Sequence, residues 1–269
     1  MHLTILGSGT SHGIPMLGCD CPVCRSMDSR DQRFRASLYI QGSGGEGVVI
    51  DTGPEFRLQA LRAGIRRLDA VFLTHSHADH IHGIDDVRPL SKEVPLPVYG
   101  SRETIEEFRA RFSYVFRETQ RGGGKPQLCP ITAEGDPIAI GGLSFTPIPV
   151  RHGALPILGW RIDEVSPDKT SAVYLTDTSE IPGPSWPLIG SPAVLVIGAL
   201  RTRPHSTHFN FDQALDAAAK IGAPRSFLTH ICHDYHHQAI EEYCRNYQEE
   251  HKISGLYMGP AYDGLELTI

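Results

Sequence analysis

The segment His75-Ser76-His77-Ala78-Asp79-His80 places three imidazoles and one carboxylate within a single short loop. Imidazole and carboxylate groups bind Zn, Mn and Fe, and alternate residues of a compact loop can face two different ions. The alternative is a loop of solvated histidines, which would not require so dense a cluster. We therefore predict that this loop binds metal ions.

Three more residues of ligand type follow apolar, strand-like segments farther along the chain. His152 follows Val150, Asp177 follows the segment 172–175, and His230 follows the segment 226–228. A single His or Asp at a strand end is common and carries little information. Their joint occurrence after the histidine loop indicates one composite site.

A second group of ligand type is Cys19-x-Cys21-x-x-Cys24, which supplies three thiolates. A closed structural zinc site needs four ligands, so a fourth must come from elsewhere in the chain. Three free or redox-active thiols are the alternative. The spacing of the 6 cysteines in 269 residues does not resemble the disulfide framework of a small secreted fold. Cys129 and Cys244 have no partners in sequence, so we expect both to be buried.

The elements that must position these residues alternate between strands and helices, which predicts an α/β chain. Strand candidates are 3–6, 37–40, 48–50, 70–73, 98–99, 143–147, 172–175, 194–197 and 226–228. Helix candidates with apolar spacing near 3.6 are 54–63, 102–111, 211–221 and 237–249. Asn210 precedes the third of these helices and is expected to cap it. We find no linker, and we predict one domain over residues 1–269.

Composition limits the possible partners. The formal net charge is −6, and the absence of any run of five basic residues argues against binding of long nucleic acids. Neither an export signal nor an apolar stretch of about 18 residues occurs, so we predict a cytoplasmic protein without a membrane segment.

The His-x-His-x-Asp-His loop resembles the signature of the metallo-β-lactamase superfamily, whose fold is an αββα sandwich of two mixed β-sheets flanked by helices. The resemblance implies two divalent ions, Mn, Zn or Fe. It assigns His75, His77 and His152 to the first ion, Asp79, His80 and His230 to the second, and Asp177 to both, and it includes Asp79 among the catalytic residues.

Within this superfamily, the chain is similar to the phosphodiesterase that is accessory to the carbon–phosphorus lyase pathway. That family has a similar cysteine triad, completed by a histidine three residues after the last active-site histidine. This implies a structural zinc held by Cys19, Cys21, Cys24 and His233, with Cys232 as the alternative fourth ligand.

The same phosphodiesterase and tRNase Z have a catalytic histidine before the last metal histidine, at a spacing that selects His208 here. The resemblance implies that His208 is a general acid, for which an imidazole with a near-neutral pKa is suited. His205 is a competitor that the sequence does not exclude.

The substrate is predicted to be a small phosphodiester, such as a cyclic sugar phosphate or a nucleotide-like ester. Residues 153–176, between His152 and Asp177, are too few for the basic arm with which tRNase Z grips tRNA. The chain departs from the phosphodiesterase pattern at 11–15 and 198–203, where a substrate could be contacted. A thioester or lactone hydrolase and a non-enzymatic cofactor-biosynthesis relative are the alternatives. The oligomeric state stays open, a homodimer included.

Overall fold

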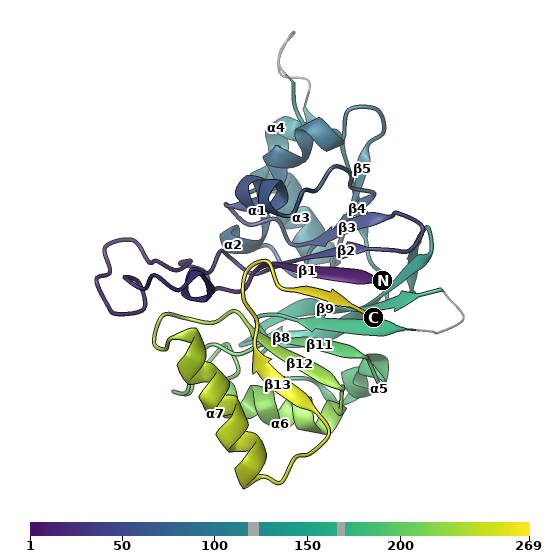
Figure 1. Cartoon of the computed structure of the whole chain (residues 1–269). Helices are drawn as coiled ribbons and strands as arrows, with labels where there is room; N and C mark the ends of the chain where they lie inside the picture. The colour runs from purple at the N-terminus through teal and green to yellow at the C-terminus, as the bar shows by residue number, and fades with distance from the viewer. Residues whose placement is uncertain (118–123, 166–169) are drawn as a thin grey trace.

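The computed structural model describes residues 1–117, 124–165 and 170–269. Two seven-stranded sheets lie face to face, and helices cover the outer face of each sheet (Figure 1). Both sheets combine parallel and antiparallel pairs. The αββα sandwich of two mixed sheets that the sequence predicts is therefore confirmed.

The first sheet contains the N-terminal strands and the last strand of the chain. Its order is β14-β1-β2-β3-β4-β5-β6. The bounds are β14 Glu266–Thr268, β1 His2–Gly7, β2 Ser37–Gln41, β3 Gly47–Ile50, β4 Ala70–Phe72, β5 Leu96–Gly100 and β6 Leu128–Thr132. Pairs from β14 to β3 are antiparallel, and those from β3 to β6 are parallel.

The second sheet has the order β13-β12-β11-β10-β9-β8-β7. The bounds are β13 Tyr257–Pro260, β12 Arg225–Thr229, β11 Val194–Gly198, β10 Ser171–Leu175, β9 Leu155–Glu164, β8 Leu143–His152 and β7 Ile138–Ile140. The four strands from β10 to β13 are parallel, so the ends of β10 and β12 lie at the same edge of the sheet.

Helices on the two outer faces complete the layers (Figure 1). The α-helices are α1 Phe56–Arg62, α2 Ala78–Ile81, α3 Arg102–Arg111, α4 Ser113–Phe116, α5 Trp186–Ile189, α6 Phe211–Ile221 and α7 His237–Glu250. Short 3₁₀ turns are η1 Ser29–Asp31, η2 Ile84–Leu90 and η3 Gly183–Ser185. No helix within the described ranges combines the length and apolar character needed to cross a membrane.

The hydrophobic core follows the layers. Between the two sheets, the ring of Phe72 on β4 stacks 4.1 Å from Phe145 on β8 and meets Trp160 on β9 edge to face at 4.8 Å. Phe108 of α3 packs against the outer face of the first sheet, and Phe211 of α6 packs against that of the second. Aromatic burial of this kind is a large part of the stabilising free energy of a sandwich.

Every predicted strand and helix is present, with ends that shift by a few residues. Strands such as β10 and β11 are buried on both faces, which is why they read as continuous apolar runs. The predicted cap also forms, because Asn210 Oδ1 accepts from Gln213 N at 2.9 Å, and Gln213 Oε1 accepts from Asn210 N at 3.0 Å.

The sequence prediction missed five strands, of which β9 matters most for the site. Pro156 and Gly159 interrupt its apolar pattern. Gly159 is required by packing, since a Cβ there would lie 2.3 Å from Leu175 Cδ2 on the neighbouring strand. β9 forms a hairpin with β8, in which His152 pairs with Leu155 across Gly153, whose φ is 61°. The hairpin fixes His152 at the end of a ten-residue strand.

Candidate metal centres

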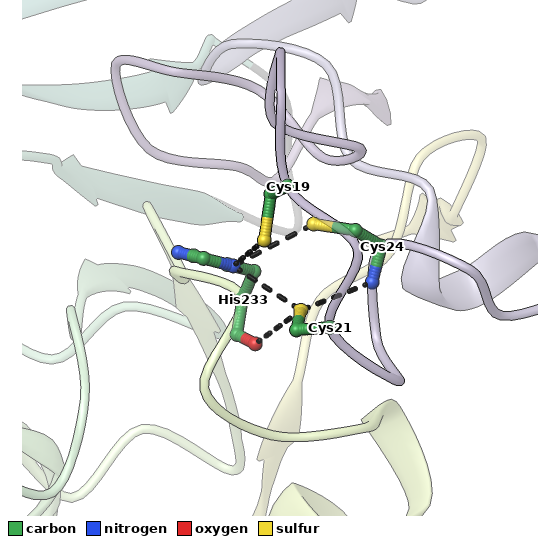
Figure 2. Close-up of side chains that lie close together, drawn as sticks. All are labelled: Cys19, Cys21, Cys24 and His233. Atoms are coloured by element: carbon green, nitrogen blue, oxygen red, sulfur yellow. Dashed lines mark hydrogen bonds between the residues drawn. The ribbon is translucent and has the colours of Figure 1, made fainter.

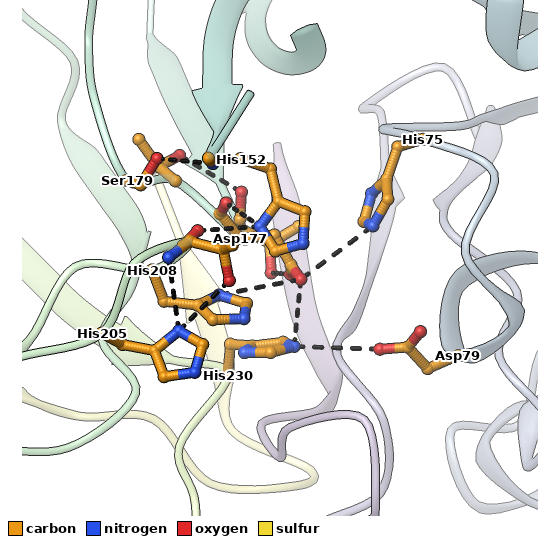
Figure 3. Close-up of polar contacts among 12 residues, drawn as sticks. His75, Asp79, His152, Asp177, Ser179, His205, His208 and His230 are labelled. Atoms are coloured by element: carbon orange, nitrogen blue, oxygen red, sulfur yellow. Dashed lines mark hydrogen bonds and ion pairs between the residues drawn. The ribbon is translucent and has the colours of Figure 1, made fainter. Parts of the chain in front are cut away.

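Seven side chains of ligand type converge at one edge of the sandwich, although they come from four separate parts of the chain. Figure 3 labels His75, Asp79, His152, Asp177 and His230 among them. One part is the loop after β4, which runs into α2. The others are the ends of β8, β10 and β12. The converging residues are His75, His77, Asp79, His80, His152, Asp177 and His230.

These side chains form two groups. In the first, one ring nitrogen each of His75, His77 and His152 lies within 4.8 Å of the others. In the second, Asp79, His80, Asp177 and His230 satisfy the same limit. The superfamily resemblance implies the same division, except that it assigns Asp177 to both groups, whereas the 4.8 Å limit places Asp177 with the second of the two.

Asp177 lies between the two groups. Its Oδ1 is 3.4 Å from His80 Nε2, and its Oδ2 is 3.2 Å from His230 Nε2 and 4.0 Å from His75 Nε2. The carboxylate is buried, with 2% of the residue exposed. Both oxygens therefore lie against the second group, and Oδ2 also approaches His75 of the first group, so this carboxylate connects the two groups.

Contacts of the Nδ1 atoms fix the ring orientation of two of the histidines, His152 and His80. Nδ1 of His152 lies 2.8 Å from the carbonyl oxygen of Thr207 and 3.0 Å from that of Asp177, so it carries the proton and donates. Nδ1 of His80 lies 2.7 Å from Asp51 Oδ2. In both rings Nδ1 is occupied by this contact, so Nε2 is the atom that faces the site and is available to a metal ion.

The backbone is strained at three positions that build the site. Asp51, Asp177 and His230 have φ values of 62°, 53° and 57°, in the left-handed region that non-glycine residues seldom adopt. Each follows a buried strand, namely β3, β10 and β12. Such conformations cost on the order of 1–3 kcal/mol each and are concentrated at functional sites.

The electrostatics suit cations. Nε2 of His75 and both ring nitrogens of His230 are buried with no hydrogen-bond partner of suitable geometry among the described residues. Burial by itself would lower the pKa of His80, but the carboxylates of Asp177, Asp79 and Asp51 hold that pKa well above its ordinary value. The site therefore favours positive charge, and its donor set fits divalent ions.

Helix α3 braces the histidine loop from outside, which the sequence did not indicate. Ser76, between His75 and His77, donates from Oγ to Glu107 Oε2 at 2.6 Å, and Arg111 Nη2 pairs with the same oxygen at 2.6 Å. Arg111 also donates to the Ser76 carbonyl. No local pattern marks these residues, because their contact depends on how α3 packs.

His208 lies beside the first and second groups, whereas His205 lies farther out. His208 Nδ1 is 3.9 Å from Asp177 Oδ2, and its ring centroid is 4.6 Å from that of His152 and 4.7 Å from that of His230. His205 is exposed, and its centroid is 5.2 Å from that of His208. Burial, followed by the charge of His230, lowers the pKa of His208 to about 3, so the near-neutral pKa that we expected is not found.

The cysteine triad meets His233 (Figure 2). Nδ1 of His233 lies 3.4, 3.3 and 3.5 Å from the sulfur atoms of Cys19, Cys21 and Cys24. For zinc bonds of about 2.3 Å to sulfur and 2.0–2.1 Å to nitrogen at a tetrahedral angle, this separation would be about 3.6 Å. The cluster is thus close to the size of a tetrahedral zinc site.

The alternative fourth ligand, Cys232, is not part of this group. The thiol of Cys232 is buried, which raises its pKa to about 11. Cys244 is buried as expected, but Cys129 is exposed. Cys129 lies on β6, at the edge of the first sheet, so the expectation of burial was wrong there because an edge strand leaves one face uncovered.

One segment after β12 carries both His230 and His233. It is held to the N-terminal loop by hydrogen bonds from Thr10 N to Ile231 O at 3.1 Å and from Ile231 N to Ser8 O at 2.9 Å. The two candidate centres are therefore linked through a few residues of fixed backbone.

Residues 47–231 match the family model described as the beta-lactamase superfamily domain. The chain belongs to the metallo-β-lactamase superfamily. This chain is similar to a diphosphatase from the PhnP family, whose crystal structure is known. The two chains are 38% identical in sequence and superpose with a TM-score of 0.84, over 100% of this chain and 97% of that chain. Together these findings support a metal-dependent hydrolase.

Two other comparisons show how far the similarity extends. Zn²⁺-bound PqqB from Methylobacterium extorquens has a TM-score of 0.79 over 100% of both chains, but at 17% identity it shows the fold alone. The octanoyltransferase of Porphyromonas gingivalis is 39% identical over 100% of this chain and 52% of its own length. The chain spans about half the length of the curated relatives it matches.

Proposed function

We propose that this metallo-β-lactamase superfamily chain is a dinuclear metal-dependent phosphodiesterase that hydrolyses a small phosphodiester. The single observation that carries the proposal is the pair of ligand groups joined by Asp177. His75, His77 and His152 would hold the first ion, Asp79, His80 and His230 would hold the second, and Asp177 would be shared between them.

Two divalent ions in these positions would lower the pKa of a bound water toward neutrality and would offset charge on the phosphoryl oxygens. The protein's part is to fix the geometry. Asp51 holds the His80 ring, and the carbonyls of Thr207 and Asp177 hold the His152 ring. Asp79 Oδ2 lies 3.2 Å from His80 Nε2 and 3.8 Å from His230 Nε2. The Asp79 side chain is partly exposed, so it can also contact water or substrate.

His208 is proposed as the general acid that protonates the leaving alkoxide. With its pKa lowered to about 3, the ring is neutral at pH 7 in the free chain. The negative charge of a bound phosphodiester beside the ring would favour the protonated form.

A small substrate is favoured by charge and by chain length. The net charge is −6, which disfavours a long phosphate backbone. Between His152 and Asp177, β9 takes up Leu155–Glu164 and β10 takes up Ser171–Leu175. Few residues remain there to build an arm for a large nucleic acid.

The Cys19, Cys21, Cys24 and His233 cluster is proposed as a structural zinc site. A backbone N–H from Cys24 and the His233 ring lower the pKa of Cys21 to about 6 against the opposing effect of burial, which favours the thiolate. Because zinc binding to such a cluster contributes folding free energy, it would stabilise the N-terminal loop beside His230.

A second candidate is hydrolysis of a carbonyl ester or thioester. The observation that favours it is the similarity to a protein named octanoyltransferase, although this chain covers only half of that protein. The same pair of ions could activate water toward a carbonyl group. A carbonyl substrate would not require His208 as an acid to the same degree.

The deciding experiment compares substrate classes on one preparation of known metal content. Bis(p-nitrophenyl) phosphate, an octanoyl thioester and a lactone are assayed after chelation and after addition of Mn²⁺ or Zn²⁺. The proposal expects metal-dependent turnover of the phosphodiester, with much slower turnover of the other two. Metal-dependent turnover of the thioester or lactone alone would establish the second candidate, and no turnover with both ions bound would contradict both.

A further inference from the structure

We propose that Glu107 and Arg111 of α3 are positioning residues that hold His77 in place for the ion of the first group, and so set how tightly that ion is bound. The effect on turnover rests on the proposed function, because it assumes that the reaction needs both ions. The effects on ion binding and on the histidine loop can be measured without turnover.

His77 is the ligand of the first group that its own ring contacts hold least. Among the described residues, the ring hydrogen bonds of this group all belong to the other two members. Nδ1 of His152 contacts two backbone carbonyl oxygens, and Nδ1 of His75 lies 3.0 Å from Thr74 Oγ1. His77 is also the exposed member of the group. Metal-binding imidazoles are normally oriented through their second nitrogen, so the orientation of His77 depends on its backbone instead.

The backbone next to His77 is held by α3. Ser76 donates from Oγ to Glu107 Oε2 at 2.6 Å, and Arg111 Nη2 lies 2.6 Å from the same oxygen. Arg111 also donates from Nη1 to the carbonyl oxygen of Ser76. That carbonyl belongs to the peptide group that joins Ser76 to His77. The contacts therefore fix both the side chain before His77 and the peptide group that leads into it.

Helix α3 is a firm support for these contacts. Ser101 Oγ caps the helix by accepting from Thr104 N at 3.1 Å. Phe108 is completely buried against the outer face of the first sheet. Glu107 and Arg111 lie one turn apart on this helix, at the i,i+4 spacing that brings side chains together. The histidine loop is thus tied to a capped helix by charge-assisted hydrogen bonds, which are the stronger kind.

An ordinary surface ion pair is the plainer interpretation. The side chains of Arg111 and Glu107 are 39% and 54% exposed, and exposed pairs contribute little to stability. Such a pair needs no third residue. Here both partners also contact Ser76, which stands between two ligands of the first group. A surface pair would leave ion binding unchanged, whereas a positioning pair would affect the first ion selectively.

The test measures Mn²⁺ binding by calorimetry on the chain freed of active-site ions. His77→Ala identifies the binding step of the first group, because it removes a ligand of that ion alone. In Glu107→Gln we expect the dissociation constant of this step to rise about 10-fold or more, as is typical when a residue that orients a ligand is lost. The step of the second group should keep its wild-type affinity.

Two comparisons distinguish positioning from a general loss of structure. Glu106→Gln changes the neighbouring exposed carboxylate of α3, which has no contact with Ser76 among the described residues, and should bind Mn²⁺ like the wild type. Arg111→Met should weaken the same step as Glu107→Gln, and the double variant should weaken it by less than the two effects combined. The thermal midpoint of Glu107→Gln should stay near that of the wild type, since the pair is exposed.

The kinetic form of the effect is a loss of turnover that excess Mn²⁺ restores. In Glu107→Gln, the Mn²⁺ concentration that gives half-maximal phosphodiester turnover should rise by the same factor as the dissociation constant. The kcat at saturating Mn²⁺ should stay near the wild-type value. A kcat that stays low at saturating Mn²⁺ would contradict an action through ion affinity.

Hydrogen–deuterium exchange on the ion-free chain separates this inference from the proposed function. Backbone amides of the histidine loop should exchange faster in Glu107→Gln than in the wild type and in Glu106→Gln. If ion binding and exchange change as expected but no phosphodiester is turned over, the positioning role stands and only the proposed reaction fails. An unchanged dissociation constant for the first group, equal weakening of both steps, or unchanged exchange in Glu107→Gln would overturn the positioning role.

Discussion

The Nδ1 atom of His80 lies 2.7 Å from Oδ2 of Asp51, and both side chains are completely buried. Asp51 also accepts hydrogen bonds from Thr74 N and Thr74 Oγ1, each at 2.8 Å. The Asp51 carboxylate, at the end of β3, thus contacts both Thr74, at the start of the histidine loop, and the candidate metal ligand His80. It is held so firmly that it fixes the orientation of the His80 ring.

Replacing Asp51 by Asn should weaken metal binding at the second group. Partners of this kind typically account for a 10- to 100-fold change in metal affinity, so we expect a loss on the order of tenfold or more. Metal content and dissociation constants of purified Asp51→Asn are measured against the wild type. Asp136→Asn, which changes an exposed carboxylate between β6 and β7, is the matched control. Wild-type affinity in Asp51→Asn would contradict the orienting role.

Removal of His233 should release one zinc ion per chain and lower the thermal stability. The reason is that a structural zinc site with three ligands no longer closes, and its binding free energy is also folding free energy. His233→Ala is compared with Cys232→Ser, which lies next to it but outside the cluster. Cys21→Ala should behave like His233→Ala. If His233→Ala kept all of its zinc while Cys232→Ser lost an ion, the fourth ligand would be Cys232.

Replacing His208 by Ala should reduce phosphodiester turnover on the order of 10² or more while both ions stay bound. The reduction should be large for an alkyl leaving group and small for p-nitrophenolate, because a good leaving group departs without a proton. Rates on both ester types and metal content are measured on the same sample. His251→Ala, at the end of α7, is the control. An equal reduction for the two leaving groups would remove proton donation from the role of His208.

The pKa of His208 predicts how pH affects the stability of the metal-free chain. Burial and the charge of His230 lower this pKa from 6.5 to about 3 in the folded state. Between these values the unfolded chain binds a proton that the folded chain does not, so the contribution to stability is present above pH 6.5 and is lost as pH falls.

Urea unfolding in chelator tests this at several pH values between about 7 and 4. Relative to His208→Gln, the wild type should lose up to about 1.4 kcal/mol of unfolding free energy per pH unit below the unfolded pKa. The comparison with His208→Gln cancels the titration of the other histidines to first order. A difference between the two proteins that does not change with pH would show that the His208 pKa is not lowered.

The sequence by itself determined those features of the protein that depend only on residues close together in the chain. The loop from His75 to His80 and the triad from Cys19 to Cys24 are contiguous, so their chemistry can be read without a fold. The apolar runs that became the central strands, and the Asn210 cap of α6, are likewise local patterns. These features were sufficient to predict the fold class and the superfamily.

Only the tertiary structure decided which distant residues meet. Sheet pairing and the packing of layers bring the ends of β8, β10 and β12 to the histidine loop, and no local spacing encodes those contacts. The same long-range packing puts His233 rather than Cys232 against the cysteines, and Asp51 against His80.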